Sequence, residues 1–74
     1  MTTVEILEAA RDTWLEWRYG LGWTEASPLG AIGTVTRSFT AERRAWNILS
    51  AVSVDEPWCA PDWDAAISAA MREQ

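Results

Sequence analysis

Along the first twenty or so positions, apolar and polar residues recur with the period of an amphipathic α-helix. Thr2 and Glu5 have the spacing of a capping box, which would begin the helix. Gly20 is a typical residue at which a helix ends. We therefore predict a helix over residues 2–19. Its inner face spans an arc of about 100° on a helical wheel and comprises Ile6, Leu7, Ala10, Trp14, Trp17 and Leu21.

A second, shorter helix is predicted over residues 28–37. Ser27 and Pro28 are typical of an N-cap and of the first position of a helix. Two glycines, Gly30 and Gly33, lower the helix propensity of this segment, so irregular structure over 29–37 stays open as an alternative. If the helix forms, we expect these glycines to permit the near approach of another backbone.

Two further helices are predicted toward the end of the chain, over residues 40–53 and 61–73. Thr40 is the expected N-cap of the first, and Asp62 suits the positive N-terminal end of the second. A loop that contains two prolines separates these helices. Their expected inner faces are Ala41, Ala45, Ile48, Leu49 and Val52 for the first helix, and Trp63, Ala66, Ile67, Ala70 and Met71 for the second.

These patterns predict an all-α protein, a compact bundle of three to four helices. The length of 74 residues leaves room for one domain, so residues 1–74 are expected to form a single helical domain. Each inner face is short, and the helices are therefore expected to depend on packing against one another.

Six tryptophans in so short a chain change this picture, because a small interior cannot easily bury them all. Tryptophans that stay at the surface would form an adhesive patch. The helical pattern directs Trp14, Trp17 and Trp63 toward the core. Loops or the edge of an apolar stripe hold Trp23, Trp46 and Trp58, which we expect to be partly exposed.

The composition argues against catalysis. There is no histidine, which is the commonest general base and metal ligand. Cys59 is the only cysteine, so an internal disulfide or a cysteine-rich zinc site cannot form. We expect its thiol to be inert and partly buried. The protein is therefore predicted not to be an enzyme, and no metal or cofactor is expected.

The formal net charge is −5, which disfavours binding to nucleic acid or to anionic membranes. No apolar run is long enough to span a bilayer, and the first residues lack the features of a signal peptide. A lone thiol suits a reducing compartment. A cytoplasmic protein is expected.

Two surfaces of the first helix are candidates for partner binding. One is an acidic face, which is either an ordinary solvated surface or a footprint for a basic partner. The other combines apolar, aromatic and arginine residues, as protein interfaces do, although packing against another helix would explain it equally. The acidic face comprises Glu5, Glu8, Asp12 and Glu16, and the mixed seam comprises Val4, Arg11, Leu15, Arg18 and Tyr19.

Several short motifs occur in a recognisable order. They are Gly22-Trp23-Thr24, Leu29-Gly30-Ala31-Ile32, Ala45-Trp46 followed by Leu49, and Trp63-Asp64 before an alanine-rich last helix. In this order the chain resembles small uncharacterised all-helical proteins of actinobacteria and their phages. The resemblance implies a short accessory protein, plausibly phage-encoded. It assigns no role to any residue.

Together these features favour a non-catalytic protein-binding module that engages a protein of the host cell. The tryptophans 23, 46 and 58 and the two surfaces of the first helix are its candidate contacts. Two alternatives stay open. The chain could self-associate as a homodimer through the mixed seam, or it could act as an acidic decoy or regulator of a DNA-binding protein.

Overall fold

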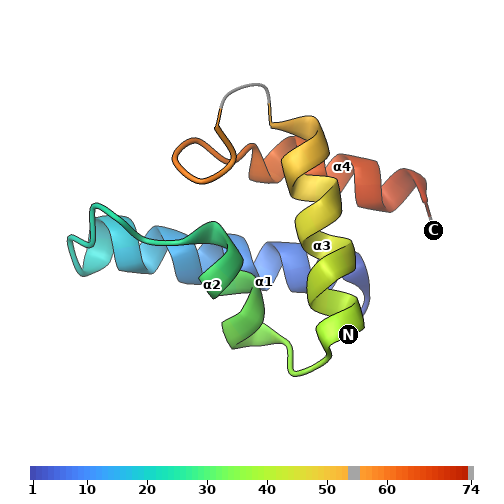
Figure 1. Cartoon of the computed structure of the whole chain (residues 1–74), viewed down its shortest axis with the longest axis horizontal. Coiled ribbons are helices and arrows are strands. Elements are labelled where there is room, and N and C mark those ends of the chain that lie inside the picture. Colours follow the sequence, from blue (N-terminus) through green and yellow to red (C-terminus); the bar gives the residue numbers. More distant parts are fainter. Residues whose placement is uncertain (54–55, 74) are drawn as a thin grey trace.

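The computed structural model describes residues 1–53 and 56–73, and within these residues all regular structure is helical (Figure 1). The all-α prediction is confirmed. The elements are α1 (Thr3–Leu15), a π-helical turn η1 (Glu16–Gly20), α2 (Pro28–Val35), α3 (Phe39–Val52) and α4 (Trp63–Arg72). The predicted ends lie within two residues of the observed ends, as is common, when η1 is counted with the first helix; α1 itself ends four residues before the predicted position 19.

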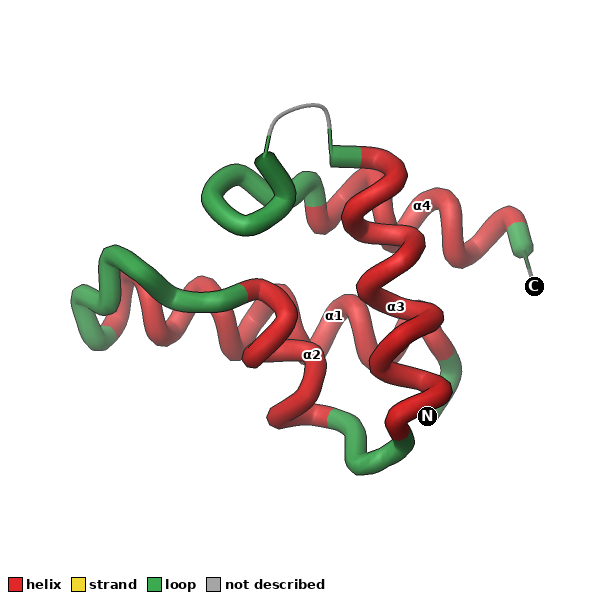
Figure 2. The backbone as a smooth tube through the Cα atoms, viewed as in Figure 1, coloured by secondary structure: helices red, strands yellow, loops and turns green. Residues whose placement is uncertain are grey.

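Helix α1 is the element against which the other three helices pack. In Figures 1 and 2, α3 crosses over α1 and connects the α2 side of the molecule to the α4 side. The shape is flat, with extents of 34 × 27 × 16 Å. The core lies where the four helices meet, and its largest fully buried side chains are Ile6, Leu7, Pro28, Ile32 and Leu49.

The predicted start of the first helix is confirmed in detail. The backbone N–H of Glu5 donates to Thr2 Oγ1 at 3.2 Å, and the N–H of Thr2 donates to Glu5 Oε1 at 2.9 Å. Both hydrogen bonds of the capping box are therefore present. At α2, Ser27 Oγ accepts from the N–H of Gly30 at 3.0 Å, which confirms the predicted cap there.

The predicted cap of α3 was wrong. Ser38, not Thr40, is the N-cap: its Oγ accepts from the N–H of Ala41 at 3.2 Å. Thr40 lies inside the first turn. The predicted role of the α2 glycines was also wrong, because the nearest atoms to a side chain built at Gly30 or Gly33 belong to side chains and not to another backbone.

Two residues predicted to face the core are exposed. Leu21 is 54% exposed, because the chain leaves α-helical geometry at residue 16 and a 100° wheel no longer describes it. Met71 is 56% exposed, although Ala70 in the same turn of α4 is buried in the core. Val4, placed in the mixed seam, packs in the core. The predicted loop over 54–61 falls partly outside the described residues.

Candidate interaction surface

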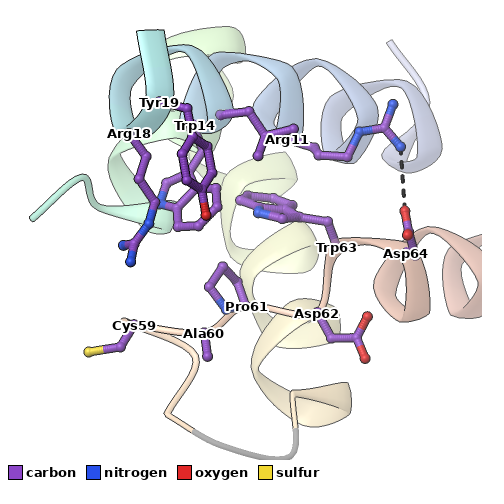
Figure 3. A pocket seen from close by; sticks show the side chains of 11 residues that line it. Arg11, Trp14, Arg18, Tyr19, Cys59, Ala60, Pro61, Asp62, Trp63 and Asp64 are labelled. Carbon is purple, nitrogen blue, oxygen red and sulfur yellow. Dashed lines mark ion pairs between the residues drawn. The ribbon is translucent and has the colours of Figure 1, made fainter. Parts of the chain in front are cut away.

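A long hollow lies between the end of the first helix and the segment that leads into α4 (Figure 3). Its volume is about 610 Å³. Arg11, Trp14 and Tyr19 come from the helical side, and residues 59–64 form the opposite side. In Figure 3, Trp63 points from the start of α4 into the space between these two sides.

A second hollow of about 400 Å³ adjoins the first, because Arg18 and Cys59 line both. It is bordered by residues 24–27 on one side and by Trp58 on the other. We call the two adjoining hollows the furrow. An occupant that fills both parts has to be elongated.

Trp14 is the fixed part of the furrow floor. It is 6% exposed, and its indole Nε1 donates to the carbonyl oxygen of Ala26 at 2.9 Å. The ring of Trp63 lies tilted against it with centroids 6.2 Å apart, and Tyr19 meets it edge-on at 6.5 Å. Aromatic pairs in these arrangements attract one another beyond the area they bury. The floor is therefore a connected aromatic cluster.

The π-helical turn brings Arg18 and Tyr19 to the edge of this cluster. The N–H of Leu21 donates to the carbonyl of Glu16, five residues earlier, at 2.8 Å. A wider turn brings the residue five positions after Trp14 nearer to the Trp14 side of the helix than an α-helical turn would. π-Helical turns are rare, and they occur frequently at functional sites.

The two arginines of the furrow differ in their ionic partners. Arg11 pairs with Asp12 at 3.2 Å and with Asp64 at 3.6 Å. Arg18 forms no ion pair with any residue in the described ranges. Its guanidinium lies 5.3 Å from the centroid of the Trp14 ring and donates a weak hydrogen bond to the carbonyl oxygen of Thr24 at 3.5 Å. Stacking on aromatic rings holds Arg18 in place, so most of its donors stay available to a ligand.

Trp63 carries an unmet hydrogen-bond donor. The residue is 5% exposed, and its buried Nε1 has no acceptor among residues 1–53 and 56–73. Leaving such a donor unpaired costs about 1–3 kcal/mol. The segment before it is held firmly: the N–H of Asp62 donates to Ser53 Oγ at 3.1 Å, and Asp62 Oδ1 caps α4 by accepting from Ala65 N–H at 3.1 Å.

The structure gathers half of the predicted partner-binding residues around the furrow: Arg11, Leu15, Arg18, Tyr19 and Trp58 all line it. Leu15, Tyr19 and Trp58 are 38%, 72% and 54% exposed. Trp46 is half-buried and supports Trp58, with ring centroids 4.6 Å apart. The expected partial exposure of tryptophans 23, 46 and 58 is confirmed.

The other predicted contacts lie elsewhere. Trp23 is 52% exposed and packs on Trp17 at 5.6 Å, away from the residues that line the furrow. Glu8, Asp12 and Glu16 form an exposed face of the first helix that does not line the furrow. Whether these residues bind a partner stays a prediction.

Sequence reasoning missed several contributors to the furrow, among them Glu25 and Asp62 of its rim. Trp14 and Trp63 were assigned to the core, where they do lie, but their partly enclosed edges also form the floor. Asp64 was assigned only to the helix dipole. Cys59 was expected to be partly buried and is exposed, because it lies in the turn beside Trp58 with its Sγ 3.8 Å from Glu56 Oε2. The sequence contains no pattern from which the proximity of residues 59–64 to Arg18 could be predicted.

The electrostatic and metal-binding features are simple. Glu5 has a pKa below its ordinary value, because its carboxylate accepts the backbone and side-chain hydrogen bonds of Thr2. No group of three or more potential metal ligands occurs among residues 1–53 and 56–73. In the same part of the chain, no helix is both long and apolar enough to cross a bilayer.

Comparison with known proteins finds no family model, no curated protein and no solved structure that this chain matches.

Proposed function

We propose that the chain is a small protein-binding module and that the furrow is its binding surface. The observation that carries this proposal is the gathering of exposed Leu15, Tyr19 and Trp58 around a hollow that also contains a half-buried arginine. Aromatic residues and arginine are enriched at the centres of protein interfaces. Rigid rings at the rim give a partner large contact area at a small entropic cost.

No catalytic step is assigned to the furrow. The sequence contains no histidine, and two of the carboxylates that line the furrow, Asp62 and Asp64, serve as a helix cap and as an ion-pair partner. A binding role needs neither a general base nor a metal. If the chain is phage-encoded, as its resemblance to small phage proteins implies, a protein of the host cell is the expected partner.

Self-association is the second candidate function. Leu15 and Tyr19 of the mixed seam are exposed and could meet the same residues of another copy across a two-fold axis. The burial of Val4 in the core narrows the seam. Light scattering over a dilution series separates this candidate from binding to a different protein, because only a homodimer changes mass as the chain is diluted.

The binding proposal is tested by replacing a furrow ring and a matched control ring. Tyr19 and Phe39 are 72% and 70% exposed, and each has an arginine guanidinium 5.8 Å from its ring centre. Tyr19→Ala should weaken capture of a partner from a cell lysate by about thirtyfold or more, as loss of an interface anchor of about 2 kcal/mol does. Phe39→Ala should leave capture unchanged.

Trp58→Ala gives an independent measure at the second hollow. It should also reduce capture, while far-ultraviolet circular dichroism verifies that each variant is folded. Equal capture by the parent chain, Tyr19→Ala and Trp58→Ala would refute the furrow as the binding surface. Loss of capture in Phe39→Ala alone would move the surface to the α2–α3 side of the molecule.

A further inference from the structure

The rim of the furrow is acidic. Glu25, Asp62 and Asp64 line it, and Glu56 lies beside Cys59. All four residues are exposed. The arginines of the furrow are only two, and one of them is already paired. The charge presented to an incoming partner is therefore negative, in the same sense as the net charge of −5 for the whole chain.

The rim carboxylates keep much of their capacity to bind a cation. The side chain of Asp64 is 91% exposed despite its 3.6 Å pair with Arg11. Asp62 uses one carboxylate oxygen as the α4 cap. Glu25 forms no ion pair with any residue in the described ranges.

The floor of the furrow, in contrast to its acidic rim, offers hydrogen-bond donors to a ligand. In the part of the chain that the structure describes, Trp63 Nε1 is a buried donor without an acceptor, and no carboxylate pairs with Arg18. A ligand suited to this surface thus offers hydrogen-bond acceptors to the floor and positive charge to the rim. An extended peptide does both, because its backbone carbonyls are acceptors and its lysine or arginine side chains are cations.

We propose that the furrow binds an extended, basic segment of a partner protein. The segment's side-chain cations would face Glu25, Asp62 and Asp64, and a backbone carbonyl would pair with Trp63 Nε1. This inference rests on the proposed binding function and adds the chemistry of the partner. The indole N–H is covered in the free protein, so pairing it requires the furrow to open slightly around the carbonyl. The two hollows share Arg18 and Cys59 in their linings, so one continuous segment can contact both.

The inference is tested by nuclear magnetic resonance of the six indole N–H groups during peptide titration. The probe is a capped pentapeptide with arginine between two alanines on each side, and its analogues carry glutamine or glutamate at the centre. Trp63→Phe identifies the Trp63 resonance. The arginine peptide should bind about tenfold more tightly than the glutamate peptide at low salt. It should also move the Trp63 resonance downfield, as a new hydrogen bond does, and leave that of Trp23 unmoved.

Two variants, each of which removes one negative charge, test whether the acidic rim attracts the arginine peptide. Glu25→Gln and Glu73→Gln remove one negative charge each, but Glu73 follows the far end of α4, about 15 Å from Trp63 at 1.5 Å per residue. That separation exceeds the Debye length of about 8 Å at physiological salt. Glu25→Gln should weaken the binding of the arginine peptide by up to about fivefold, which is the value of one exposed ion pair. Glu73→Gln should bind as the parent chain does.

Three results would overturn the inference. If all three peptides move the furrow resonances with equal affinity, the basic segment is wrong while docking in the furrow stands. If the resonances move with protein concentration alone, a second copy is the occupant. If no peptide moves them, the inference fails, and capture by the Tyr19 and Phe39 variants then decides separately whether the furrow binds a protein at all.

Discussion

Two buried tryptophans allow the value of one hydrogen bond to be measured inside this fold. Trp14 and Trp63 are 6% and 5% exposed and lie against each other with ring centroids 6.2 Å apart. They differ in their indole N–H groups. Trp14 Nε1 donates to Ala26 O at 2.9 Å, whereas Trp63 Nε1 has no acceptor within the described residues. Substitution by phenylalanine removes the same atoms from both positions.

The expected effects on stability differ because the hydrogen bonding differs. Trp14→Phe breaks this bond and leaves the carbonyl of buried Ala26 unpaired, at a cost of about 1–3 kcal/mol. Trp63→Phe instead removes an unpaired buried donor, which offsets part of its lost ring contacts. Since the ring loss is common to both, we expect Trp14→Phe to be the less stable by about 2 kcal/mol or more.

Urea unfolding followed by far-ultraviolet circular dichroism measures this difference, because it does not depend on tryptophan emission. A gap of about 2 kcal/mol corresponds to roughly 8–16 °C in melting temperature for a chain of this size. The denaturant slopes must agree between variants for the comparison to hold. Single variants are compared because contacting residues are not additive. Equal stabilities, or a less stable Trp63→Phe, would refute the reasoning.

Three further predictions concern the start of the first helix and the turn that follows its end. Gly22 has φ of +74° with open space around it, so Gly22→Ala should destabilise by about 1 kcal/mol through the backbone alone. Gly20→Ala should stabilise the fold by about 0.5–1 kcal/mol, since only the flexible Glu16 carboxyl has to move. Urea unfolding measures the stability of both glycine variants. A less stable Gly20→Ala variant would contradict the second expectation. Because the pKa of Glu5 is lowered in the folded state, its ionised form stabilises the fold at neutral pH, and this contribution disappears as pH falls through the lowered pKa. Melting temperatures across acidic pH should therefore fall more steeply for the parent chain than for Glu5→Gln, which keeps the cap acceptor; parallel curves would contradict the assignment.

Local signals were sufficient for most of the secondary structure. Thr2 and Glu5 form the expected capping box, and Ser27 and Pro28 begin α2 as predicted. Such signals work because they involve residues three or four positions apart, within one helical turn. At α3 the prediction named Thr40 alone, whereas Ser38, two positions earlier, makes the capping hydrogen bond. Local chemistry alone did not separate these two hydroxyls.

The failure at Leu21 has a specific cause. A helical wheel assumes one rotation per residue, and the π-helical turn over Glu16–Gly20 breaks that assumption. Residues before the turn follow the prediction, with Trp14 in the core, and Leu21 after it is exposed. The same turn presents Tyr19 at the furrow. One departure from regular geometry thus accounts for both an error in the predicted core and the position of a candidate contact.

The furrow was only half predictable. Its helical side, including Leu15, Arg18 and Tyr19, was visible as a stripe of interface-like composition. Its other side depends on how the segment before α4 returns toward α1, a tertiary arrangement fixed in part by the hydrogen bond from Asp62 N–H to Ser53 Oγ. The unmet donor of Trp63 could not be foreseen, because pairing of an indole N–H depends on its neighbours in space.

The exposed fraction of a tryptophan does not show whether its ring closes a loop or lines the furrow, as Trp23 and Trp58 illustrate. The two are almost equally exposed, at 52% and 54%. Trp23 closes the loop after η1: its N–H donates to Trp17 O at 2.8 Å, its carbonyl accepts from Ala26 N–H at 3.2 Å, and its ring packs on Trp17. Trp58 lines the furrow and is supported from behind by half-buried Trp46. Two almost equally exposed indoles thus have different surroundings: Trp23 closes a loop, and Trp58 lines the furrow that we propose as the binding surface.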